Sequence, residues 1–192
     1  MITGALIFLV QTALGLFTTA LLLRFYLQWA RAPYRNPLSD FLNALTDFAV
    51  RPARRIVPGL WGLDLATLVL AWLAQLLELF IVLGIKGYAL GTATGSALAA
   101  LVMLSALMMI KLALYIVIVA VLIQAVLSWV NPYSPLAPLL NSMTKPFLRV
   151  FQKLIPPIGN VDLSPLFVII VCQLLLIAPV THFETTLWRL LA

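Results

Sequence analysis

The chain has 192 residues, of which 64% are hydrophobic and only 9% are charged, and its formal net charge is +6. Soluble domains carry roughly 25% charged residues, so these values exclude a soluble enzyme, a disordered segment and a disulfide-knit secreted domain. They indicate an integral membrane protein with several spans.

Four apolar stretches are long enough to cross a bilayer, because a transmembrane helix needs roughly 20 residues. They cover residues 2–29, 64–85, 98–130 and 162–180, and a short tail follows the last of them. The third stretch exceeds the required length, so we expect it to tilt, to kink near Lys111, or to begin with an interfacial turn. The sequence therefore predicts an all-α membrane protein with four transmembrane helices.

Two polar and basic segments, 30–63 and 131–161, each connect two spans. Apolar residues recur in them at helical spacing and cations occupy the remaining arc, which predicts one or two short helices lying in the headgroup layer. Pro52 and Pro146 argue against one continuous helix in either segment. Two roles remain open, anchoring by anionic lipid headgroups and docking of a cytoplasmic partner. The cations of these faces are Arg51, Arg54, Arg55, Lys145, Arg149 and Lys153.

Asp64 and Asp162 each stand at the start of a span. A carboxylate at a helix start accepts the unpaired amide groups and complements the positive end of the helix dipole. The alternative role for the two acids is a paired entry site for a cation. The same capping rule makes Thr46 and Thr144 the predicted N-caps of the interfacial helices.

The two halves of the chain repeat each other. Eleven residues between Leu42 and Leu77 recur at an offset of 98, and six between Ala13 and Trp29 recur at an offset of 100. We therefore predict two tandem repeats, 1–95 and 96–192. Because each repeat contains an even number of spans, the repeats are parallel and both basic segments lie on one side of the membrane.

The distribution of cations predicts which side that is. Eight lie with the basic segments, whereas only Lys86 and Arg189 lie on the opposite side. The positive-inside rule then predicts a multi-pass protein of the cell inner membrane with cytoplasmic basic segments and periplasmic termini. Lipid headgroups account for the positive charge better than nucleic acid, so no nucleic-acid partner is expected. The eight cations are Arg31, Arg35, Arg51, Arg54, Arg55, Lys145, Arg149 and Lys153.

Arg24, Glu78 and Lys111 are charged residues within the spans. A charge at the bilayer centre costs at least about 2.5 kcal/mol, so each needs a partner or access to water. At 1.5 Å per residue, Glu78 lies about 21 Å beyond Asp64 and Lys111 about 27 Å from Trp129. Both then lie in the outer part of the membrane, and we predict that they pair. The alternative is a role in an ion or proton path, whereas Arg24 can snorkel to the inner interface.

Gln75 and Gln173 correspond across the two repeats, near the middle of the membrane. Interhelical hydrogen bonding between the second and fourth spans is the expected role of this pair. The chain has a single histidine and a single cysteine and no motif typical of catalysis or phosphate binding. We therefore expect no metal, no cofactor and no enzymatic activity.

Four segments together resemble the YggT family of small bacterial and plastid membrane proteins: 22–30, 51–58, 127–130 and 155–165. The resemblance covers nearly the whole chain and is closest to the two-repeat proteobacterial form. The chain departs from the family pattern in 58–66 and at Val150 and Gln152, which puts equal roles for the two halves in doubt.

The resemblance implies an inner-membrane protein linked to osmotic-stress tolerance, with potassium uptake proposed for the family. Single-repeat relatives are associated with cell division or nucleoid distribution, and plastid relatives with cytochrome assembly. Two hypotheses follow. The protein supports ion or osmotic homeostasis, directly or by modulating a partner, or it is a scaffold or assembly factor that acts through its basic faces. A homo-oligomer or a membrane-protein partner is compatible with either.

Overall fold

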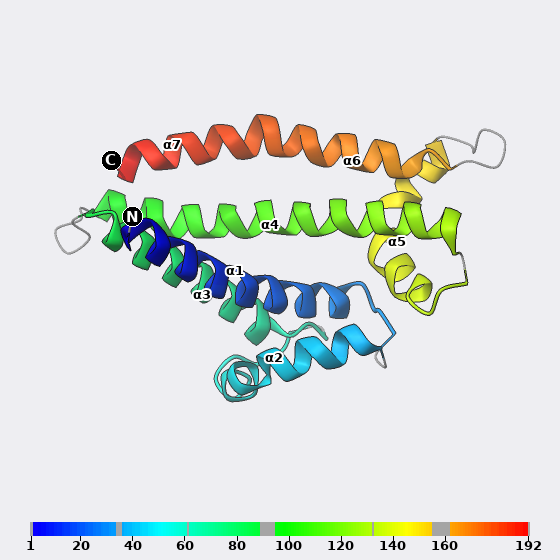
Figure 1. Ribbon diagram of the computed structural model, residues 1–192, viewed down its shortest axis with the longest axis horizontal. Helices are drawn as coiled ribbons and strands as arrows, with labels where there is room; N and C mark the ends of the chain where they lie inside the picture. The colour runs from blue at the N-terminus through cyan, green and yellow to red at the C-terminus, as the bar shows by residue number, and fades with distance from the viewer. Residues whose placement is uncertain are drawn as a thin grey trace.

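The computed structural model describes residues 2–33, 36–60, 62–88, 95–131, 133–154 and 162–191, so Arg35 and most of the 155–165 motif lie outside the described residues. The elements within them are helical (Figure 1). In chain order they are α1 (Ile2–Trp29), α2 (Pro37–Ala53), α3 (Leu65–Ile85), α4 (Gly95–Val130), α5 (Ala137–Leu154), α6 (Ser164–Leu175), the π-helical segment η2 (Leu176–Val180) and α7 (Thr181–Leu191).

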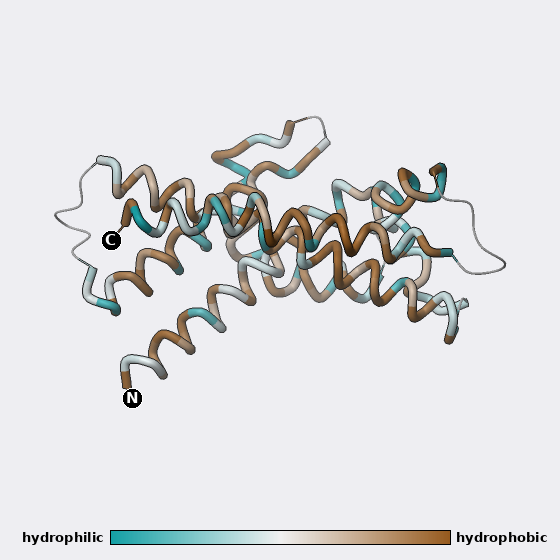
Figure 2. The backbone as a smooth tube through the Cα atoms, turned by 90° about the horizontal axis from the view of Figure 1, so that it is seen from above, coloured by the Kyte–Doolittle hydropathy of each residue, from teal (hydrophilic) through white to brown (hydrophobic). Residues whose placement is uncertain are grey.

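Four helical stretches are long and apolar enough to cross a membrane: α1, α3, α4 and the continuous run Ser164–Leu191. The predicted fold class is thereby confirmed, and Figure 2 shows hydrophobic residues dominating these long helices. α4 is continuous through Lys111 over 36 residues. At 1.5 Å per residue it is about 54 Å long, so it extends well beyond a hydrocarbon core of about 30 Å.

The helix of the predicted fourth span does not end at residue 180 but continues to Leu191, so the residues expected to form a short tail are helical. Pro179 lacks an amide hydrogen, and the helix accommodates it within the π-helical turn η2. The Thr181 hydroxyl donates to the Leu176 carbonyl at 2.8 Å in this turn. The helix then continues as α7, because its apolar side, including buried Leu187, packs with α3 and α4 residues.

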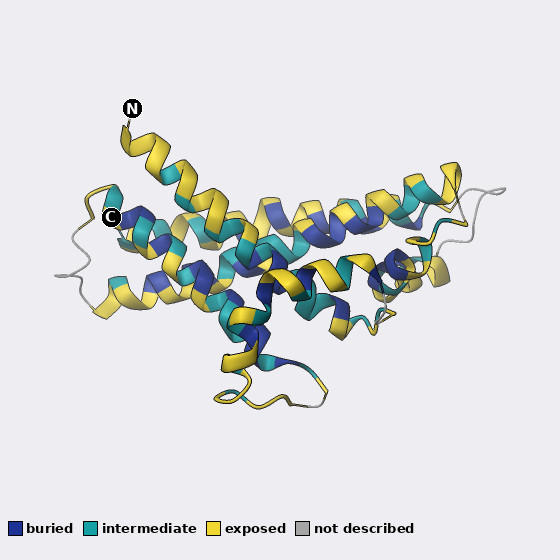
Figure 3. Cartoon of the chain, turned by 60° about the horizontal axis from the view of Figure 1, so that its bottom comes forward, coloured by how far each residue is buried: buried dark blue, intermediate teal, exposed yellow. Residues whose placement is uncertain are grey.

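Each half of the bundle is built around one pair of antiparallel helices. α1 packs along α3, and α4 packs along α6 and α7, while α3 and α4 join the two halves. Figure 1 accordingly shows α4 between the α6–α7 run on one side and α1 with α3 on the other. The N-terminal half of α1 projects from the bundle and is largely exposed (Figure 3).

The amphipathic helices α2 and α5 follow the first span of each half. Asn36 is the N-cap of α2, and its side chain accepts the Ser39 amide at 2.8 Å. Pro52 lies in its last turn, whereas α5 continues through Pro146, so the expected interruption of α5 is absent. The burial of one α5 face against α4 and α6 holds the helix together across the proline.

Thr46 and Thr144 are not N-caps, contrary to the prediction. Both lie inside their helices, α2 and α5, and both are fully buried. Each hydroxyl is bonded to the carbonyl four residues earlier, Leu42 at 2.6 Å and Leu140 at 2.9 Å. These buried hydroxyls instead face the first span of each half, as described below.

Candidate functional site

Asp47 is the centre of a network that ties α1 to α2. Arg24 of α1 donates from Nη1 to Asp47 Oδ1 at 2.8 Å and to Thr46 Oγ1 at 2.7 Å. Arg51 donates from Nε and Nη2 to Asp47 Oδ2 at 3.0 and 2.7 Å. The side chain of Arg24 is 12% exposed and that of Arg51 is 77% exposed. Asp47 therefore neutralises a buried cation and also holds an exposed one.

The charge state of Asp47 follows from these contacts. The hydrogen bond from Arg24 lowers the pKa of Asp47 below its ordinary value; burial opposes this shift, and the bond from Arg51 adds to it. The carboxylate thus stays ionised at neutral pH. Arg24 is satisfied by an ion pair with a neighbouring helix rather than by snorkelling alone.

Asp64 occupies the N-cap of α3, as predicted. Its carboxylate accepts the Thr67 amide at 3.4 Å and the Thr67 hydroxyl at 2.6 Å. Arg54 donates to Asp64 Oδ2 from Nε at 2.9 Å and from Nη2 at 2.6 Å. Burial acts to raise the pKa of Asp64, but the bonds from Arg54 and Thr67 outweigh it and leave the pKa lowered.

The side-chain amide of Gln28 binds the backbone just before α3. It donates to the Gly62 carbonyl at 2.9 Å and accepts the Asp64 amide at 3.2 Å. Gly62 has a φ of 79°, a backbone conformation that a residue with a Cβ adopts only under strain. Asp64 is therefore held from α1, from the end of α2 and from the first turn of α3.

The second half places neutral groups at the corresponding positions. Gln124 contacts Thr144 where Arg24 contacts Thr46 in the first half. Gln152 donates to Asp162 at 2.8 Å where Arg54 donates to Asp64. Asp162 Oδ1 accepts the amide of Ser164, the first residue of α6, at 2.8 Å. The same contacts thus recur in both halves with arginine replaced by glutamine.

Lys111 pairs with Glu184, so the predicted pairing of Lys111 with Glu78 was wrong. Lys111 Nζ donates to Glu184 Oε2 at 2.7 Å, which joins α4 to α7. The register of α3 on α4 explains the difference. Leu79 packs in one cluster with Leu104, and Lys111 lies seven residues, or about 10 Å, further along α4. Arg24, Glu78 and Lys111 therefore have separate surroundings and do not form one cluster.

Glu78, Gln75 and Gln173 do not make the contacts that the sequence predicts for them. Gln75 is buried and donates to Glu78 Oε2 at 3.4 Å within α3, and Glu78 faces Gly15 of α1. Gln173 is exposed on α6. The two glutamines therefore do not share one environment, although they correspond in the sequence.

The cations of α5 remain at the surface. Lys145, Arg149 and Lys153 are exposed and follow one another at intervals of four residues, so they form one line on the helix. No acidic partner contacts them within the described ranges. We call these three residues the α5 cation line. Arg55, in the turn after α2, is likewise exposed.

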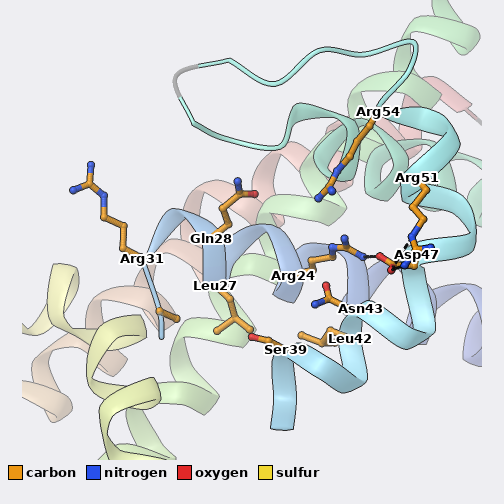
Figure 4. A pocket seen from close by; sticks show the side chains of 11 residues that line it. Arg24, Leu27, Gln28, Arg31, Ser39, Leu42, Asn43, Asp47, Arg51 and Arg54 are labelled. Carbon is orange, nitrogen blue, oxygen red and sulfur yellow. Dashed lines mark hydrogen bonds and ion pairs between the residues drawn. The ribbon is translucent and has the colours of Figure 1, made fainter. Parts of the chain in front are cut away.

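Two pockets accompany these side chains. The first, of about 460 Å³, lies between α1 and α2 and is lined by Arg24, Arg31, Arg51 and Arg54 together with Asp47 (Figure 4). We call it the arginine pocket. The second, of about 690 Å³, is apolar and is lined by residues of α1, α3, α4 and α5 that include Trp29, Trp72 and Phe147.

Sequence reasoning missed two of the acids that matter most here, Asp47 and Glu184. The spacing of Asp47 and Arg51, four apart on an amphipathic helix, would have predicted their ion pair. Glu184 lies in residues 182–192, which are expected from the sequence to form a short tail. Apolar and polar residues recur there at helical spacing, and this pattern could have predicted α7.

Comparisons with known proteins give one family and several relatives. The model of the family described as CCB3/YggT matches residues 3–85 and 103–182. An uncharacterized protein of Pseudomonas aeruginosa is 40% identical over 173 residues, which cover 89% of this chain and 86% of the relative. The uncharacterized protein YggT of Escherichia coli K12 is 27% identical over 168 residues, which cover 87% and 85%. No solved structure matches the chain significantly.

Proposed function

The chain belongs to the CCB3/YggT family, and from this premise we propose that it is a non-catalytic scaffold of the bacterial inner membrane. In this proposal the α5 cation line docks an acidic surface of a cytoplasmic partner protein. Support of osmotic or ion homeostasis, including potassium uptake, would then come through that partner. The intramembrane charges serve to hold the bundle together.

One observation carries the proposal. The cations inside the bundle are matched with acids, Arg24 with Asp47 and Lys111 with Glu184. The cations of the α5 cation line are exposed, and no acid pairs with them in the part of the chain that the structure describes. Paired charges stabilise a membrane bundle, whereas an exposed line of one sign suits recognition of an opposite charge.

The orientation in the membrane is part of the proposal. If all four apolar helical stretches cross the membrane, the segments 30–63 and 131–161, which contain α2 and α5, lie on the same side. These two segments carry eight of the twelve lysine and arginine residues of the chain. The positive-inside rule supports a cytoplasmic location for this side and a periplasmic location for both termini.

Site-specific photo-crosslinking in intact membranes tests the docking role. A photoreactive residue at Val150 lies on the exposed surface of α5, and one at Ile170 lies on the exposed surface of α6. We expect a discrete protein adduct from position 150 and none from position 170. Replacement of Lys145, Arg149 and Lys153 by glutamine should abolish the adduct, while the amount of inserted protein stays the same. Absence of an adduct, or an adduct that survives the triple replacement, would contradict the proposal.

A second candidate, direct passage of a cation, is favoured by one observation. Glu78 is a partly buried carboxylate within α3, and no cation pairs with it among the described residues. Potassium flux into proteoliposomes, measured for the wild type and for Glu78→Gln, decides this candidate. Flux that Glu78→Gln abolishes would support it, whereas no flux from correctly inserted protein would leave the scaffold role.

A further inference from the structure

The arginine pocket carries more positive charge than its acids compensate. Four arginines line it against a single carboxylate, that of Asp47. Asp47 is shared between Arg24 and Arg51. Arg54 pairs with Asp64, and Arg31 has no side-chain partner within the described residues. An excess of guanidinium groups around a cavity is the arrangement that recognises a phosphate or a carboxylate.

The backbone at Arg31 gives an independent indication that an arginine is needed there. Arg31 is the non-glycine residue with positive φ, 50°, in the part of the chain that the structure describes. Its amide bonds to the Gln28 carbonyl and the Ala32 amide to the Leu27 carbonyl, both at 3.0 Å, which is the geometry of a helix end that favours glycine. The chain therefore holds an arginine where glycine would be less strained.

Neutral donors and an apolar wall complete the pocket. The Ser39 hydroxyl oxygen accepts from the Asn36 amide at 2.7 Å, so its own hydrogen remains free to donate. The Asn43 side chain also lines the cavity, and Leu27 and Leu42 supply an apolar wall. Cations, small polar donors and aliphatic carbon together suit a phosphate ester better than a bare inorganic ion.

We propose that the arginine pocket binds a phosphate ester through Arg31, Arg51 and Arg54 at its rim, while Arg24 and Asp47 keep its inner wall in place. Figure 4 shows Arg54 directed toward Gln28 and Arg24, and Arg31 on the far side of Gln28 with its side chain extending outward from the end of α1. The phosphate belongs either to the headgroup of an anionic phospholipid or to a soluble phosphate ester, because the same chemistry recognises both. This inference concerns a different surface from the α5 cation line and does not rest on the proposed function.

The second half of the chain provides a comparison within the same molecule. At the offsets of the repeat, Gln124, Asn131 and Gln152 stand where the first half has Arg24, Arg31 and Arg54. Lys145 stands where the first half has Asp47. Only the first half therefore combines the four arginines with the carboxylate that orders two of them, and we infer that the phosphate site is confined to that half.

Native mass spectrometry of the full-length chain in detergent tests the proposal with four probes. They are phosphatidylglycerol, phosphatidylcholine, glycerol 3-phosphate and inorganic phosphate. We expect saturable binding of a phosphate ester that weakens at least about tenfold when Arg31→Gln and Arg51→Gln are combined, since each charged hydrogen bond contributes about a factor of ten. The matched control combines Arg149→Gln and Lys153→Gln in α5 and should change the affinity by less than about twofold.

The four probes also identify the source of the phosphate. Preference for phosphatidylglycerol, without competition by glycerol 3-phosphate, assigns the pocket to a lipid headgroup. Binding of glycerol 3-phosphate with the same dependence on Arg31 and Arg51 assigns it to a soluble ester. Absence of saturable binding by every probe, or equal losses in the two pairs of variants, would overturn the proposal.

Arg31→Gly separates binding from folding. Glycine relieves the positive-φ strain at the end of α1, so the melting temperature should rise, while the affinity for the phosphate ester should fall. A loss of affinity together with a lowered melting temperature would mean that Arg31 acts only through the fold, and it would overturn the role given to its guanidinium.

Discussion

At the scale of single residues, Asp47 explains how a buried arginine is tolerated in α1. It accepts a hydrogen bond from Arg24 on one oxygen and from Arg51 on the other. The two arginines differ sharply in exposure, 12% against 77%. Replacement of Asp47 removes the partner of both arginines, whereas replacement of Arg51 removes only the exposed arginine. Comparing the two therefore measures what the carboxylate contributes to the stability of Arg24.

Asp47→Asn should destabilise the protein by about 1–3 kcal/mol, because Arg24 would keep its burial and lose its compensating charge. Arg51→Gln removes an exposed partner of the same carboxylate and should cost less than about 0.5 kcal/mol. Thermal unfolding of both variants in the same detergent measures the difference. Equal losses in the two variants would show that burial of Arg24 is not what Asp47 compensates.

The lowered pKa values of Asp47 and Asp64 predict how stability depends on pH. Each carboxylate is more acidic in the folded state, so folding gains stability from it at pH values above about 4, the pKa of an unfolded aspartate. That stability is lost as the pH falls through the lowered pKa values. The melting temperature should therefore drop steeply below about pH 4. The drop should be shallower in Asp64→Asn, and an unchanged profile in this variant would contradict the account.

At the scale of helices, the ion pair between Lys111 and Glu184 connects α7 to α4. If α7 is a packed helix, the two residues should be coupled. Lys111→Met and Glu184→Met should each destabilise, and the double variant should recover about 0.5–3 kcal/mol relative to the sum of the single losses. A double-mutant cycle measured by chemical unfolding checks this. Additive losses would mean that α7 does not hold Lys111.

The spans and the Asp64 cap were predictable because they depend on local signals. Apolar length predicts a membrane helix, and an aspartate before an apolar run predicts an N-cap. The partners of Arg24 and Lys111 were not predictable in this way. Which acid meets each cation depends on the register between helices, and the register is set by packing such as that of Leu83 with Leu104.

At the scale of the whole molecule, the two halves share a scaffold and differ in charge. Corresponding contacts join Arg24 to Thr46 and Arg54 to Asp64 in the first half. In the second half they join Gln124 to Thr144 and Gln152 to Asp162. Arg24 and Arg54 of the first half are replaced by the amides Gln124 and Gln152 in the second. The two halves thus keep the same contacts between helices, but the arginine pocket is lined by residues of the first half.

Transfer of the ion pair tests whether the halves are equivalent frameworks. Gln124→Arg alone should destabilise the protein, because the new arginine would face Lys145 and find no acid. Combined with Lys145→Asp, it should recover most of the loss, since the pair Arg24–Asp47 is then reproduced in the second half. The melting temperatures of the single and double variants decide this. No recovery in the double variant would mean that the two sites are not geometrically equivalent.

We propose that the charges inside the bundle are structural and that the α5 cation line carries the function. Growth of a deletion strain at high osmolarity tests this most directly, with each variant expressed at the same level in the membrane. We predict that Glu78→Gln restores growth and that glutamine at positions 145, 149 and 153 together does not. Restoration by the triple variant, together with failure of Glu78→Gln, would contradict the account and favour an ion path through α3.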